Sequence, residues 1–166
     1  MKKLILLLLS LAIGIPAFAQ NMTFSNENSS EKEIVFKDGL YLQNGAAYTG
    51  KYIAYHTNGN VKEELNILNG KLNGDVLKYF ENGTKKEVSH FENNLKFGLW
   101  VRYNTNGTVA AEASYKNDKK DGVWTVYNES GAKLFKMEYK DGEKTGTWTQ
   151  WDEVGNIIKT TTYSNL

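Results

Sequence analysis

The sequence contains no cysteine and only two histidines, so several kinds of functional site have few residues from which to form. The lack of cysteine excludes a disulfide framework, a thiolate metal site and a lipid-bearing cysteine behind a leader. No phosphate-binding glycine loop, nucleophile elbow or paired-histidine metal motif occurs in the sequence. We therefore predict that the protein is not an enzyme, and that it has no catalytic, cofactor-binding or metal-binding residue.

A run of apolar residues long enough to span a membrane is also lacking. Lys2 and Lys3 precede the short apolar stretch 4–13, and residues 17–19 (Ala-Phe-Ala) form a small-x-small cleavage site. This pattern predicts a cleaved signal peptide over residues 1–19, and hence an exported protein that is periplasmic, associated with the outer envelope, or secreted. Its removal leaves 18 basic and 19 acidic side chains. Such a balance predicts no nucleic-acid partner.

The mature chain divides into a polar segment and a repeat domain. Residues 20–35 are mostly polar and are predicted to be a flexible linker. The repeat domain is predicted to span residues 36–166. It opens with a divergent unit over residues 36–49, because Asp38-Gly39 and Asn44-Gly45 are turn signals between short apolar runs. An array needs an atypical first unit of this kind to protect its end.

A 24-residue period governs everything after this unit. Five positions after each repeat glycine comes an aromatic residue, two positions after it comes an aromatic residue or, in the second repeat, Val76, and nine positions after it comes a second glycine. A fixed period of this size indicates a repeat array. The repeats begin at Gly50, Gly74, Gly98, Gly122 and Gly146, and their second glycines are Gly59, Gly83, Gly107, Gly131 and Gly155.

Each repeat is predicted to be a β-hairpin. The second glycine follows asparagine in the first three repeats, which favours a type I′ turn, whereas Ser130-Gly131 and Val154-Gly155 suggest a different turn in the last two. Further turns are expected where Asn, Asp and Gly pairs separate consecutive repeats. The predicted fold is all-β, an array of stacked antiparallel hairpins. Its final strand, residues 157–162, is either a cap or an edge open to a partner strand.

The aromatic columns are the best candidates for core or contact residues. A single-layered repeat sheet has no other source of core, so a buried ladder is favoured over a platform for sugars or peptides. Trp100 and Tyr103 are three residues apart, and a bulge at the glycine would bring both to one face. The candidate residues are Trp100, Tyr103, Trp124, Tyr127, Trp148 and Trp151.

The other residues that could support chemistry do not form a common site. His56 and His90 occupy different positions in the repeat, six and sixteen residues after its glycine. Several glutamates are explained as exposed strand positions opposite lysines, which keep the sheet soluble. They are Glu63, Glu64, Glu87, Glu112 and Glu138.

Three stretches resemble a known family. These are Gly98-x-Trp100-x-x-Tyr103-x-x-Asn106-Gly107, the run from Tyr115 to Gly122, and the run from Asn44 to Gly50. In these stretches the chain resembles the MORN-repeat variant of bacterial proteins named the YwqK-type antitoxin family, over about residues 36–166. The resemblance implies neutralisation of a partner toxin by binding. MORN repeats in other proteins are linked to phospholipid membranes and to protein scaffolding.

The sequence therefore predicts an exported, non-enzymatic module that presents a sheet face or an edge to a protein partner, with a toxin as one candidate. The alternative is a scaffold that binds a phospholipid membrane or a cell-surface glycan through basic turns or exposed rings.

Overall fold

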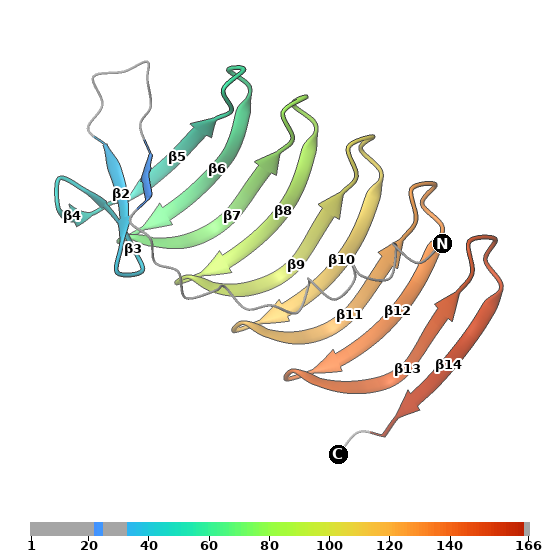
Figure 1. Ribbon diagram of the computed structural model, residues 1–166. Coiled ribbons are helices and arrows are strands. Elements are labelled where there is room, and N and C mark those ends of the chain that lie inside the picture. The colour runs from blue at the N-terminus through green and yellow to red at the C-terminus, as the bar shows by residue number, and fades with distance from the viewer. Residues whose placement is uncertain (1–21, 25–32, 165–166) are drawn as a thin grey trace.

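The computed structural model describes residues 22–24 and 33–164, and within these ranges the protein is all-β (Figure 1). A ten-stranded antiparallel sheet runs in sequence order from β5 to β14, and its strands form five stacked hairpins. A separate four-stranded sheet precedes it. The predicted fold class and the 24-residue repeat are thus confirmed. No helix in the described parts of the chain is long and apolar enough to cross a membrane.

The strands follow each other without crossovers. The small sheet consists of β1 (Met22–Phe24), β2 (Ile34–Lys37), β3 (Leu40–Gln43) and β4 (Ala46–Ala47). The first half of the large sheet consists of β5 (Gly50–Tyr55), β6 (Val61–Leu68), β7 (Lys71–Tyr79), β8 (Lys85–Glu92) and β9 (Leu95–Tyr103). The second half consists of β10 (Val109–Lys116), β11 (Lys119–Tyr127), β12 (Lys133–Lys140), β13 (Glu143–Trp151) and β14 (Ile157–Tyr163).

The small sheet extends into the residues predicted as linker. β1 lies within residues 20–35 and pairs with β2, and Ile34 is buried against the first repeats. The chain is ordered here because Ile34 and Val35 continue the apolar pattern of β2. The two strands of the divergent opening unit and the two-residue turn between them, Asp38-Gly39, are found as expected. The signal peptide and the rest of the linker lie outside the described residues.

Turns between consecutive hairpins have two residues, both with positive φ, as a type I′ turn requires. At Asn69-Gly70, for example, φ is 50° and 77°, and the flanking Leu68 and Lys71 pair directly. Only glycine, asparagine and aspartate adopt this conformation at low cost, so the sequence of these turns fixes their position. The other turns of this type are Asn93-Asn94, Asn117-Asp118 and Asp141-Gly142.

The turns inside the hairpins differ from the prediction. Gly59 has a φ of 85°, whereas Asn58 is not among the described residues with positive φ, so a type I′ turn is wrong here. The N–H of Gly59 donates to the carbonyl of His56, and the N–H of His56 donates to the carbonyl of Asn60. This is a three-residue loop with glycine in the left-handed position. Gly83, Gly107, Gly131 and Gly155 repeat it.

The expected change of turn type in the last two hairpins is also wrong, and side-chain chemistry explains why. In the second and third hairpins the asparagine before glycine caps the turn; Asn106 Oδ1 accepts from the N–H of Thr108. In the fourth hairpin Asn128 Oδ1 accepts from the N–H groups of Ser130 and Ala132. Asp152 takes the same role in the fifth. The residue that supplies the accepting oxygen thus occupies a different position in the last two hairpins, but the loop conformation is the same.

The sheet is curved into a trough, because every strand bends along its length (Figure 1). Each pair of neighbouring strands in the large sheet has one register shift. The shift of β10 against β11, for example, lies between Ala113 and Tyr115, opposite Gly122. Gly122 has a φ of 105°, where side chains are disfavoured. Bulges of this kind increase the local bend.

The two aromatic columns lie on opposite faces of the trough, as strict alternation requires, so the bulge does not bring both inward. Trp124 pairs with Ala113, and both side chains are buried. Tyr127 instead donates its hydroxyl to Glu112 Oε2 at 2.8 Å. Glu112 alternates with Ala113 along the strand and so faces the other side. The bend does not change the alternation between positions two and five of the repeat.

The core lies on the concave face in two connected parts. In the first two repeats it is mainly aliphatic, and Ile34 and Tyr41 of the small sheet pack over it. In the last three repeats it is aromatic. The aliphatic part contains Ile34, Tyr52, Leu65, Ile67, Val76 and Phe91, and the aromatic part contains Ala113, Tyr115, Trp124 and Tyr139.

Replacement of a repeat glycine should cost more stability than replacement of a turn glycine. Gly107→Ala adds a Cβ with no atom within 4 Å, so only the left-handed backbone cost of about 1–2 kcal/mol applies. Gly122→Ala places the Cβ 3.1 Å from the Cβ of Ser114 and adds a steric cost. We expect a larger fall in the urea midpoint for Gly122→Ala; equal falls would contradict this account of the bend.

Candidate binding groove on the concave face

The concave face carries a ladder of stacked rings that crosses seven strands, from β8 to β14. Tryptophans from the first strand of each hairpin alternate with tyrosines from the second; Phe91 occupies the first tyrosine position. Successive ring centroids are 4.9–5.4 Å apart, and the ring planes are inclined by 53–60°. Tilted rings at this distance attract each other beyond the effect of burial. The ladder consists of Phe91, Trp100, Tyr115, Trp124, Tyr139, Trp148 and Tyr163.

Each tryptophan of the ladder also satisfies a backbone group at a bulge. The indole N–H of Trp124 donates to the carbonyl of Ser114 at 3.0 Å, where the register between β10 and β11 shifts. Trp148 bonds in the same way to the carbonyl of Glu138 at 3.0 Å. Trp100 bonds to that of His90 at 3.1 Å. Phenylalanine has no donor, so at these three positions tryptophan supplies both a ring for the ladder and a partner for the carbonyl at the bulge.

Three lysines cover the open faces of the rings. Lys120 Nζ lies 4.3 Å from the Trp124 ring centroid and 4.6 Å from that of Tyr139. Lys96 and Lys144 lie in the same way over the next pairs of rings on either side, at 4.8–5.3 Å. Burial, together with the charge of Lys144, lowers the pKa of Lys120. The lysines form a row of positive charges along the groove, each attracted to the rings beneath it.

A largely apolar wall rises beside this row, toward the hairpin turns. It borders a cavity of about 820 Å³, whose lining includes Ala111, Val126, Leu134 and Phe80, with Arg102 at its side. Polar residues of the hairpin turns, among them Glu129 and Glu153, and the predicted contact residues Tyr103 and Tyr127 also line this cavity. Arg102 pairs with Ala111, which lies two residues before Ala113 and hence on the same face as the ladder. In the first two repeats the equivalent positions hold Lys62, Glu63, Lys78, Lys86 and Glu87.

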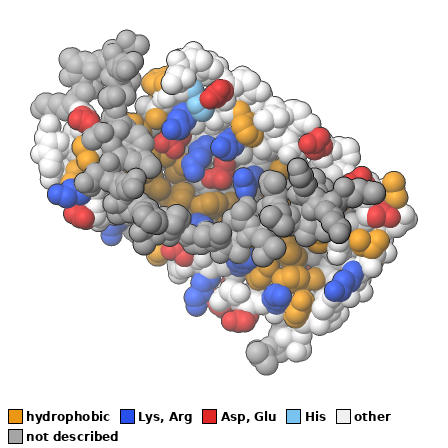
Figure 2. Space-filling view, in the orientation of Figure 1, with side chains coloured by type: hydrophobic (Ala, Val, Ile, Leu, Met, Phe, Trp, Pro, Cys, Tyr) orange, Lys and Arg blue, Asp and Glu red, His pale blue; other side chains and the backbone are white. Residues whose placement is uncertain are grey.

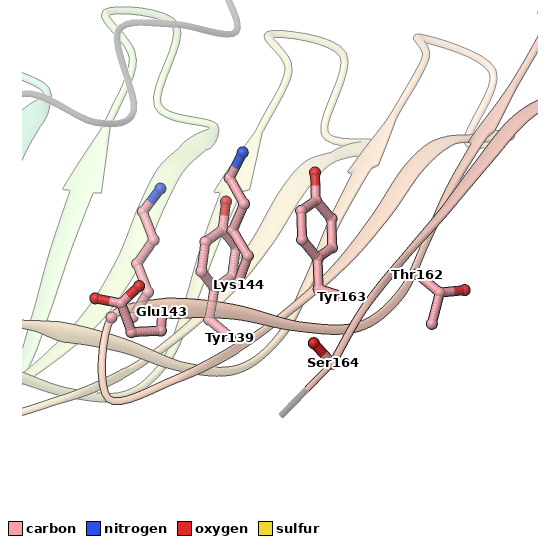
Figure 3. Close-up of a pocket in the computed structure, with 8 residues that line it drawn as sticks. Tyr139, Glu143, Lys144, Thr162, Tyr163 and Ser164 are labelled. Atoms are coloured by element: carbon pink, nitrogen blue, oxygen red, sulfur yellow. The ribbon is translucent and has the colours of Figure 1, made fainter. Parts of the chain in front are cut away.

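A second hollow of about 670 Å³ lies at the C-terminal end of the ladder. Tyr139, Lys144 and Tyr163 project from the same side of the sheet, whereas Thr162 points away from them (Figure 3). Apolar and basic side chains lie together on the face seen in Figure 2. The groove therefore combines a row of lysines with an apolar wall, which is formed mainly by the third and fourth hairpins.

The predicted contact residues separate into two groups. Trp100, Trp124 and Trp148 belong to the ladder, where Trp124 is buried and the other two are half-buried. Tyr103, Tyr127 and Trp151 share the other column. Sequence reasoning did not identify the row of Lys96, Lys120 and Lys144 as a unit, although their 24-residue spacing was the signal.

The histidines and glutamates have structural partners. His56 bonds to the carbonyl of Tyr79, and His90 Nδ1 lies 2.9 Å from Asp75 Oδ1. The expected pairing of glutamates with lysines is found in part. Glu138 pairs with the expected Lys136 at 3.1 Å, whereas Glu87 pairs with Lys78 at 3.6 Å. Glu112 accepts from Tyr127 instead, and these glutamates are half-buried rather than exposed. Within residues 33–164 no group of three or more acidic, histidine or cysteine side chains could hold a metal ion.

A curved sheet of like hairpins, each protected by its neighbours and together forming an open groove, defines a repeat scaffold for binding. The family model of the MORN repeat variant matches residues 48–69, 72–93, 98–117 and 120–141, more than half of the chain, and the protein belongs to this family. MORN repeats are generally protein- or membrane-binding modules. The fifth hairpin, β13–β14, lies beyond the matched segments but repeats their geometry. A comparison with curated proteins found no match.

The buried ladder should make the protein less stable at high pH. Burial, with a smaller effect of the Glu87 charge, raises the pKa of Tyr115 to about 12. The unfolded chain releases this proton near pH 10, so the stabilisation is complete below about pH 10 and is lost as the pH rises toward about 12. The loss due to Tyr115 is about 2–3 kcal/mol.

Urea unfolding at about pH 9 and at about pH 12 gives the fall in the free energy of unfolding between the two. We expect Tyr115→Phe to make this fall smaller by about 2–3 kcal/mol. Tyr55→Phe, which alters an exposed ring, controls for the loss of a hydroxyl group. An unchanged pH dependence in Tyr115→Phe would contradict the role of the buried ladder.

Proposed function

We propose that the protein is an exported, non-enzymatic scaffold whose concave groove binds a segment of a partner protein. The observation that carries this proposal is the groove over the last three repeats, where the apolar wall of Ala111, Val126 and Leu134 lies beside the lysine row. The first two repeats do not offer this combination, because the small sheet packs over them.

The chemistry of the groove indicates what the partner segment should carry. Its apolar side chains would face the wall, and its carboxylates would face Lys96, Lys120 and Lys144. Successive lysines come from strands two positions apart, and hence about 9.6 Å apart along the groove. A chain in the polyproline II conformation has three residues per turn and rises about 3.1 Å per residue, so every third side chain faces the same way at intervals of about 9.3 Å. A segment in this conformation with an acidic residue at every third position would therefore match the row.

An antitoxin function is one form of this proposal, in which the bound segment belongs to a toxin. Binding to a membrane would instead use the same lysine row to contact anionic phospholipid headgroups. We favour a protein partner because the wall beside the lysines is apolar and concave, and a flat lipid surface would not reach into it. Binding to a cell-surface glycan would require exposed rings in a row, whereas the rings of the ladder are covered by lysines and by each other.

Capture experiments should show groove-dependent binding. With residues 20–166 as bait, we expect one stoichiometric protein partner from an envelope extract, identified by mass spectrometry. Lys120→Glu should abolish its capture, because it reverses the charge at the centre of the row. Lys116→Glu is the matched control, since Lys116 is exposed and, by alternation with Tyr115, faces away from the ladder.

Equal capture by Lys120→Glu and the unaltered protein would contradict the proposal. Salt-sensitive co-sedimentation with anionic phospholipid vesicles, without a protein partner, would support the membrane alternative.

The proposed export has a test of its own. The leader over residues 1–19 predicts that the mature chain begins at Gln20. Intact-mass measurement of the protein from the envelope or medium should give the mass of residues 20–166. A full-length chain that remains in the cytoplasm would contradict export without affecting the groove.

A further inference from the structure

The C-terminal edge of the large sheet is unusually apolar. β14 is the last strand of the sheet and pairs only with β13 among the described strands. Ile157 and Ile158 in this strand are 61% and 57% exposed, and Val154 in the preceding turn is 84% exposed. They are the three most exposed of the large hydrophobic side chains in the described part of the protein.

The position of Val154 holds asparagine or serine in all the other hairpins. The position of Ile158 holds Lys62 and Lys86 in the first two hairpins and Ala110 and Leu134 in the next two. Ala110 and Leu134 lie in interior strands with a neighbour on both sides, whereas Ile158 lies in the edge strand. Natural edge strands are protected against pairing by proline, by several charges or by a covering segment. β14 has no proline, and Lys159 is its only charge.

The opposite edge of the sheet adjoins the small sheet. The hydroxyl of Tyr48 donates to the carbonyl of Lys51 in β5 at 3.0 Å. Tyr48 and Tyr41 also exchange backbone hydrogen bonds with Gly70, so that the end of the small sheet is tied to the first repeat turn. Among the described residues, β14 is therefore the edge strand of the large sheet that has no such neighbouring segment.

We propose that β14 pairs with β14 of a second copy of this chain, antiparallel and about a twofold axis. With the axis at Thr160, Ile157 pairs with Tyr163, Ile158 with Thr162, and Lys159 with Thr161. The strand is complementary to itself in this register, because the two lysines do not oppose each other. A twofold contact uses the one open edge of each copy, so it closes at a dimer and forms no filament.

The ladder supports the same arrangement. Each interior ring contacts a ring on both sides, whereas Tyr163 contacts Trp148 on one side only among the described residues. Pairing through β14 would cover the free side of Tyr163 and join the two concave grooves into one. The dimer is independent of whether the groove binds a protein.

Sedimentation equilibrium of residues 20–166 tests this proposal. We expect the unaltered protein to reach twice the monomer mass as its concentration rises. Ile158→Lys should return it to the monomer mass, because it restores a residue that the first two repeats carry at this position. Leu99→Lys is the matched control: Leu99 is 53% exposed in the interior strand β9, and its equivalent in the first repeat is Lys51. This variant should remain dimeric.

A monomer at every concentration, a mass that grows beyond the dimer, or a dimer unaffected by Ile158→Lys would overturn the proposal. If Ile158→Lys fails to fold, amide exchange of the unaltered protein decides. The amides of β14 should exchange more slowly as protein concentration rises, and exchange that does not depend on concentration would refute pairing through β14.

Discussion

The contact between rings of adjacent strands is the interaction on which the whole array depends. A single-layered sheet has no second layer against which to bury side chains, so its core must come from neighbours within the layer. Trp124 achieves this with Tyr115 on one side and Tyr139 on the other, at 5.1 and 5.4 Å. Lys120 covers the remaining face. The concave face therefore carries a single layer of packed rings, which consists mainly of tryptophan and tyrosine.

Local chemistry made much of the fold predictable. The period, the hairpins and the two-residue turns depend on residues close in sequence, such as Asn69-Gly70, and were read correctly. The type of the other turns was not, because Asn-Gly fits both a type I′ turn and the end of a three-residue loop. Pairing of His56 with Asn60 decides between them, and this depends on strand register. Asn128 and Asp152 then replace the missing asparagine from a different position.

The site was harder to predict because it depends on the curvature of the sheet. Strict alternation separates Trp100 from Tyr103, but only the structure shows that bulges preserve this alternation. The lysine row was visible as a spacing, yet its place over the rings follows from the bend. The covering of the first two repeats by Ile34 and Tyr41 involves contacts between distant segments, which no local pattern encodes.

The distribution of tryptophan gives the array a built-in optical asymmetry. All four tryptophans, Trp100, Trp124, Trp148 and Trp151, lie in the last three hairpins, whereas the first two have only tyrosine and phenylalanine as aromatic residues. Indole emission therefore reports on the C-terminal part of the trough alone. A change in indole emission that precedes the loss of the sheet as a whole would show that the array frays from its open end.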